Sequence, residues 1–260
     1  DENALNEDEI SMENIDSVVA PASMGRGTVC GYLKWQETDK DMHPLSGIKV
    51  EIYYTSELLG VDIKLATTYT DDDGYYQTDI DAHNNVYIKI YAGDGNIMVG
   101  SGIFGWPYSL KFDADKYNVS VGDTVNIRTR VVTMKHNETI DDEVKHAFQI
   151  GQAAIAARDY ADAMMDQNVT GVTIIYPSLP AIGTCYTPVL SCIAIEKYIS
   201  TTLSSYEAWD IIMHEYGHHI EFLLNIMLDP LKSHDTWWAL SDTYDSVDKG
   251  TRMAWGESWN

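Results

Sequence analysis

The stretch DIIMHEYGHHIEF, residues Asp210 to Phe222, combines the apolar spacing of a helix with two histidines four residues apart. On an α-helix, His214 and His218 lie about one turn apart, so their side chains are close enough to share one ion. Glu215 directly follows the first histidine. The stretch therefore predicts a helix that holds a metal ion with a carboxylate beside it.

The residues around this stretch indicate where the predicted helix begins and ends. Ser204 followed three residues later by Glu207 fits a capping box, and Pro230 stands where a helix should stop. The two histidines occupy a different face from the apolar side chains that are expected to pack in the core. These are Trp209, Ile212, Met213, Tyr216, Ile220, Leu223, Leu224 and Met227.

Zinc is the ion that suits this arrangement. It accepts neutral imidazole and carboxylate ligands in a tetrahedron, and a catalytic site leaves its fourth position to water. Glu215 would not bind the metal. It is the predicted general base, which takes a proton from a zinc-activated water as that water attacks a carbonyl and passes the proton to the departing amine. The predicted function is that of a zinc-dependent metallo-endopeptidase, a hydrolase of peptide bonds.

A third zinc ligand must come from elsewhere in the chain. The extended metzincin pattern requires Gly at position 221 and His at position 224, where this chain has Glu221 and Leu224. Glu221 lies one turn beyond His218 on the same helix, so we expect it to support that histidine or to be exposed rather than to bind zinc. Glu257, in the stretch RMAWGESWN, is the predicted third ligand.

The reaction also needs a hydrogen-bond donor near the developing oxyanion. Tyr244, His234 and His219 are candidates by their nearness in the sequence. Tyr244 is the predicted catalytic donor. The alternative for Tyr244 is an ordinary core or surface tyrosine.

Over roughly residues 137–260, HEYGHHIE followed at a distance by AWGES resembles the gluzincin group of zinc metallopeptidases. The resemblance implies that the two motif histidines and Glu257 bind zinc, with Glu215 as the base. It also implies an edge strand near Ile193–Ile195, along which an extended peptide could lie. The 38 residues between His218 and Glu257 exceed the interval of thermolysin-like enzymes. The chain stops three residues after Glu257, so we expect an incomplete catalytic domain.

Residues 26–134 alternate apolar and polar side chains in several short runs separated by Gly, Asp and Asn. Such runs are typical of a small antiparallel sandwich. TTYTDDDGYYQ (Thr67 to Gln77) favours a hairpin over a calcium site, because its spacing fails the calcium-loop pattern. Together with PLSGIKVEIYY (Pro44 to Tyr54), it resembles the carboxypeptidase regulatory-like and transthyretin-like sandwiches that often precede catalytic domains in secreted enzymes.

The predicted chain is therefore multidomain. An acidic arm spans residues 1–25, an all-β antiparallel sandwich spans 26–134, and an α+β zincin-like metallopeptidase domain, C-terminally incomplete, spans 137–260. The last domain begins with one long helix over about 139–166, where apolar side chains recur at three- and four-residue steps. Two strands should follow before the histidine helix.

The composition limits the classes of partner that the protein is expected to bind. With 17 basic and 40 acidic side chains the net charge is −23, which disfavours nucleic acid and anionic lipid. No apolar run is long enough for a membrane span, and DENALNEDEI lacks the features of a signal peptide. A peptide or protein substrate and a secreted or cell-surface location are expected, and the oligomeric state stays open.

Two alternatives also stay open. Cys185 and Cys192 could form a disulfide in an oxidising compartment or remain two reduced thiols. The chain as a whole could instead be an extracellular or surface binding or adhesion protein, with a zinc site that is structural or inactive. A structural zinc has four protein ligands, whereas a catalytic zinc keeps a position for water.

Overall fold

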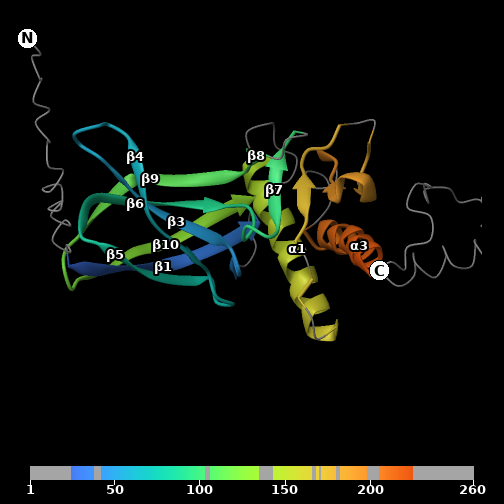
Figure 1. Ribbon diagram of the computed structural model, residues 1–260, viewed down its shortest axis with the longest axis horizontal. Helices are drawn as coiled ribbons and strands as arrows, with labels where there is room; N and C mark the ends of the chain where they lie inside the picture. Colours follow the sequence, from blue (N-terminus) through green and yellow to red (C-terminus); the bar gives the residue numbers. More distant parts are fainter. Residues whose placement is uncertain are drawn as a thin grey trace, which may run out of the picture.

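The structure is a computed structural model that describes residues 25–37, 42–102, 106–134, 143–165, 168–169, 171–179, 182–197 and 205–224. These ranges contain strands in three sheets and two α-helices, α1 and α3 (Figure 1). The elements are β1 Arg26–Glu37, β2 Met42–Pro44, β3 Lys49–Thr55, β4 Asp62–Tyr69, β5 Tyr75–Asp81, β6 His83–Tyr91, β7 Met98–Ser101, β8 Trp106–Pro107, β9 Ser109–Val119, β10 Thr124–Met134, α1 Glu143–Met165, β11 Thr173–Ile175, β12 Cys185–Thr187, the 3₁₀ turn η2 Pro188–Leu190, β13 Cys192–Ala194 and α3 Ser205–Leu223.

Two four-stranded sheets form a sandwich. One has the order β10–β1–β2, with β5 also paired to β1, and the other has the order β4–β3–β6–β9. Alternate side chains of both sheets are buried in a shared core, among them Val29 and Leu33 of β1, Ile52 of β3 and Ile88 of β6. The period-two pattern of the sequence therefore reports which side of each strand faces the other sheet.

The prediction of an all-antiparallel sandwich is wrong. β1 and β10 run parallel over most of their lengths, from the Thr28–Thr124 pair to the Glu37–Met134 pair. The alternation of apolar and polar residues depends on burial of one face and is the same for either strand direction. The pattern could locate these strands but could not orient them.

The third sheet joins segments that are far apart in the sequence. Its order is β12–β13–β11–β7–β8, and β7 pairs in parallel with β11. Strands β7 and β8 fall within the range 26–134 that the sequence predicts for the sandwich, yet they pair in the sheet beside α1 and α3 (Figure 1). No helix among the described residues is long and apolar enough to cross a membrane.

The predicted α+β zincin-like domain with several helices is also wrong. In the part of the chain that the structure describes, 49% of the residues are in strands and 25% in helices, and α1 and α3 are the two α-helices. The helix expected over about 139–166 corresponds to α1. Apolar spacing could predict these two helices because it is local, whereas the zincin-like domain came from the family resemblance.

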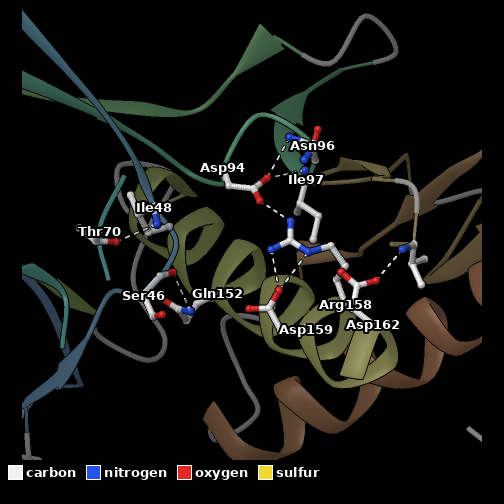
Figure 2. A network of polar contacts seen from close by, with 11 residues as sticks. Ser46, Ile48, Thr70, Asp94, Asn96, Ile97, Gln152, Arg158, Asp159 and Asp162 are labelled. Atoms are coloured by element: carbon white, nitrogen blue, oxygen red, sulfur yellow. Dashed lines mark hydrogen bonds and ion pairs between the residues drawn. The ribbon is translucent and has the colours of Figure 1, made fainter. Parts of the chain in front are cut away.

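Helix α1 lies between one end of the sandwich and the third sheet (Figure 1). Ser46 N donates to Gln152 Oε1 at 2.8 Å, and Gln152 Nε2 donates to Ser46 O at 3.1 Å, which ties α1 to the loop before β3 (Figure 2). A Cβ at Gly151 would lie 3.1–3.2 Å from the backbone of Ala92 and Gly93, so glycine permits this close approach. A single core runs from the sandwich through α1 to α3.

The outer face of β3 carries a buried carboxylate. Glu51 is 3% exposed, and its Oε2 accepts hydrogen bonds from Tyr53 OH at 2.7 Å and Tyr91 OH at 2.6 Å. Lys49 Nζ and Lys64 Nζ lie 2.9 and 3.2 Å from Oε1. Burial alone would raise the pKa of Glu51, but these four hydrogen bonds outweigh it and lower the pKa to about 2.

This carboxylate should make the stability of the fold depend on pH. The folded pKa is below the ordinary value of 4.5, so the stabilisation is complete above pH 4.5 and is lost as the pH falls toward 2. Glu51→Gln is expected to lower the free energy of unfolding at pH 7 by about 2–3 kcal/mol. Urea denaturation at pH 7 and pH 3 would measure the difference, which should shrink at pH 3.

Glu57→Gln, an exposed position near the end of the same strand, should change stability by less than about 0.5 kcal/mol. A difference that is the same at both pH values would contradict the prediction.

Candidate metal centre

Helix α3 brings the two motif histidines together. The Nε2 atoms of His214 and His218 are 3.1 Å apart, and the two rings lie nearly perpendicular with centroids 4.6 Å apart. Two nitrogen atoms that each bind a tetrahedral zinc ion at about 2.0–2.1 Å are separated by about 3.3 Å. The two imidazoles therefore fit zinc in both atom type and spacing.

Glu221 contacts the His218 ring at Nδ1, and the Nε2 atom of the same ring faces His214. His218 Nδ1 lies 3.1 Å from Glu221 Oε2, and both side chains are buried. A carboxylate at Nδ1 favours the tautomer that carries its proton there, so the lone pair is on Nε2, the nitrogen that faces His214. Of the two alternatives that the sequence leaves for Glu221, support of His218 or exposure, the structure has the first.

Glu215 lies on the side of α3 that faces β12. Its carboxylate is 4% exposed, and Oε2 accepts a hydrogen bond from the backbone N–H of Tyr186 at 2.7 Å. Tyr186 OH lies 3.3 Å from Nδ1 of His219, and the two rings meet edge to face at 5.4 Å. Backbone and side chain of Tyr186 therefore both fasten β12 to the helix. They also hold Glu215, which directly follows His214 in the chain, against β12.

Strand β12 is one of the two edge strands of the third sheet, and β8 is the other. The strand near Ile193–Ile195 that the resemblance implies as an edge is β13, which pairs with β12 on one side and β11 on the other. Its side chains are all buried, as expected of a central strand. Sequence reasoning missed β12 and Tyr186, although a signal existed: Pro188 follows directly, and proline is confined to edges and strand ends.

Cys185 and Cys192 lie on β12 and β13, and the structure has both as thiols rather than as a disulfide. Of the two alternatives that the sequence leaves open, the structure therefore has the reduced pair. Burial raises the pKa of the Cys192 thiol, and the charge of Cys185 raises it further.

Several predicted site residues lie outside the described residues. They include Glu257 and Tyr244, so their roles as third ligand and oxyanion donor stay predictions, and the same holds for His234. Across the described ranges, no group of three or more His, Cys, Asp or Glu side chains is placed to hold a metal ion. The described part of the site thus offers two imidazole nitrogens, and a third ligand would have to come from elsewhere.

Comparisons with known proteins give no family. No family model matches the chain, and no curated protein sequence matches it. A 9R-lipoxygenase from Cyanothece PCC8801 is 14% identical with a TM-score of 0.32, over 58% of this chain and 26% of the lipoxygenase. A putative carbohydrate binding protein from Pseudomonas aeruginosa is 13% identical with a TM-score of 0.29, over 43% of this chain and 92% of that protein. Plantain pollen allergen Pla l 1 is 15% identical with a TM-score of 0.29, over 44% of this chain and 95% of the allergen.

The assignment to the gluzincins and to the regulatory-like or transthyretin-like sandwiches is therefore wrong. No family model supports it, and the described residues do not contain the three-ligand group that it requires. The reason is physical as well as statistical. A five-residue motif on one helix fixes two imidazoles and one carboxylate, but it does not specify the fold around them.

Proposed function

We propose that the protein is a zinc-dependent metallo-endopeptidase in which His214 and His218 bind zinc and Glu215 is the general base. The observation that supports this most is the 3.1 Å separation of the two Nε2 atoms, and Glu215, which directly follows His214, is buried. The proposal rests on these three side chains and their surroundings, and on no family membership. Glu257 remains the proposed third ligand.

Zinc bound there would polarise a carbonyl oxygen and make a water molecule more acidic. Side chains of the protein would orient the ligand ring and transfer the proton. Glu221 keeps the His218 ring oriented through the hydrogen bond at Nδ1. The Glu215 carboxylate would accept a proton from the water whose oxygen forms the new bond to the peptide carbon. As the C–N bond breaks, Glu215 would return that proton to the amine nitrogen.

The substrate we propose is an extended peptide lying along β12. The Tyr186 N–H points away from β13 and toward α3, so it lies on the unpaired side of this edge strand. Main-chain pairing to an exposed edge is a common way to bind an extended peptide without reading its sequence closely. A peptide carbonyl that accepts this N–H would compete with the Glu215 carboxylate, and would thereby release the base for proton transfer.

The experiment that tests the proposed function uses the full 260-residue chain. We expect about one zinc per chain by elemental analysis, and cleavage of an unfolded protein substrate such as reduced casein. Removal of the metal with 1,10-phenanthroline should stop cleavage, and added zinc should restore it. Zinc bound without cleavage would favour the binding or adhesion alternative, with a structural or inactive site. A chain that binds no zinc would overturn the proposal.

Glu221→Gln gives a further prediction for this site. The amide loses the charge that favours a proton on His218 Nδ1, so zinc affinity should fall about 10–100-fold while the fold is retained. A competition titration with a chromogenic zinc chelator would measure the affinity, and thermal unfolding of the metal-free protein would check the fold. Asp210→Asn, an exposed carboxylate on the same helix, is the matched control and should bind zinc normally. Equal zinc affinity of Glu221→Gln and wild type would contradict the prediction.

A further inference from the structure

The loop between β3 and β4 displays three apolar side chains to solvent. In residues 56–61, Leu58 is 92% exposed, Leu59 is 65% exposed and Val61 is 50% exposed. The loop lies at the end of the sandwich farthest from α1 and α3 (Figure 1). Single exposed apolar residues are ordinary, but a cluster of them on one loop indicates a contact surface.

Hydrogen bonds within the loop hold these side chains outward. Ser56 N donates to Val61 O at 2.9 Å, Gly60 N donates to Ser56 O at 2.8 Å, and Leu59 N donates to Ser56 Oγ at 3.3 Å. Gly60 has a φ of +64°, a left-handed conformation that glycine adopts without strain. The exposure of Leu58 and Leu59 is therefore a property of an ordered turn.

A second loop at the same end of the sandwich also presents an apolar side chain. Tyr54, near the end of β3, pairs with Val86, near the start of β6. His83, at the start of β6, pairs with Val119 at the end of β9. The β9–β10 turn therefore lies at the end that carries the 56–61 loop, and Val121 in that turn is 64% exposed.

The size and the charge of this end of the sandwich favour one kind of partner. A stable protein interface takes roughly 20–30 residues from each side, far more than these few protruding side chains. Binding to a lipid surface, in contrast, scales with the apolar area that enters the headgroup boundary, and protruding leucine and valine side chains contribute to that area. The net charge of −23 opposes anionic lipid, as do Glu57 in the 56–61 loop and Asp123 in the β9–β10 turn.

We propose that the sandwich end formed by residues 56–61 and Val121 docks onto an electrically neutral, zwitterionic lipid surface. Leu58 and Leu59 would enter the headgroup boundary, and the candidate metal centre at the other end of the molecule would stay accessible. This interaction does not depend on zinc or on peptide hydrolysis. It would concentrate the protein at a membrane surface, and it does not require a spanning segment.

Sedimentation with phosphatidylcholine vesicles tests the proposal on the full chain. We expect the wild type to sediment with the vesicles, and Leu58→Ser/Leu59→Ser to bind at least tenfold more weakly. Met164→Ser, which changes an apolar side chain of α1 that is 66% exposed, is the matched control and should bind normally. Far-ultraviolet circular dichroism and thermal unfolding would show that both variants fold. Adding phosphatidylglycerol should weaken binding, and adding chelator should not change it.

A tryptophan placed in the 56–61 loop gives an independent measurement of lipid contact. Leu59→Trp fluorescence should shift to shorter wavelength with phosphatidylcholine vesicles and be quenched by lipid that carries a spin label near the headgroup. Three outcomes would overturn the proposal: no binding to neutral vesicles, tighter binding to anionic vesicles, or equal binding by the double serine variant. Light scattering would also show whether the wild type forms a dimer that the double serine variant does not form. Such a dimer would mean that this sandwich end binds a second copy of the chain, and it would overturn the lipid proposal as well.

Discussion

Glu215→Gln is expected to lower kcat/KM for peptide hydrolysis by about 10²–10⁴-fold while the protein keeps its zinc. Glutamine is nearly the same shape as glutamate, and its amide oxygen can still accept the Tyr186 N–H that Glu215 accepts at 2.7 Å. The contact between α3 and β12 should therefore survive. What the amide cannot do is take up a proton from the attacking water. A fluorogenic peptide assay and elemental analysis on the same sample would measure both quantities.

The control for this variant is Asp210→Asn, an exposed acid on the same helix, which should hydrolyse peptide at the wild-type rate. Two results would count against the role of Glu215. If Glu215→Gln keeps a tenth or more of the wild-type kcat/KM with zinc bound, another group serves as the base. If the variant loses zinc, Glu215 matters mainly through its contact with β12, and the proposed proton transfer has no support.

The parts of this site that the sequence could predict are the local ones. A spacing of four residues places His214 and His218 on neighbouring turns of any α-helix, and the apolar period around them predicted that helix. Glu221 could be placed beside His218 for the same reason. Helix α1 and the buried faces of the sandwich strands followed from periodicity as well.

The parts that failed depend on contacts between segments far apart in the chain. Tyr186 reaches Glu215 through a backbone N–H, which every residue except proline carries, so no residue type marks it in the sequence. The parallel pairing of β1 with β10 leaves no trace in the alternation of side chains. Strand β7 likewise falls within the range 26–134 predicted for the sandwich, although it pairs with β11 outside the sandwich.

A second large effect is expected where α1 is tied to the loop that leads into β7 (Figure 2). Arg158 of α1 pairs with Asp94, and their side chains are only 13% and 11% exposed. Asp94 Oδ1 also accepts the backbone N–H groups of Asn96 at 2.9 Å and Ile97 at 2.8 Å. Burial by itself would lower the pKa of Arg158, but the ion pairs with Asp94 and Asp159 raise it. The guanidinium is therefore held charged at the junction.

Asp94→Ala is expected to lower the free energy of unfolding by about 3–5 kcal/mol, because it leaves a buried guanidinium without its main partner and two N–H groups without an acceptor. Urea denaturation would measure the loss. Asp159→Ala removes the 57% exposed partner of the same arginine and should cost less than about 1 kcal/mol. Asp94→Ala/Arg158→Met should be more stable than Asp94→Ala alone, since it removes the uncompensated charge. If Asp94→Ala costs no more than Asp159→Ala, the ion pair does not hold α1 against the loop before β7.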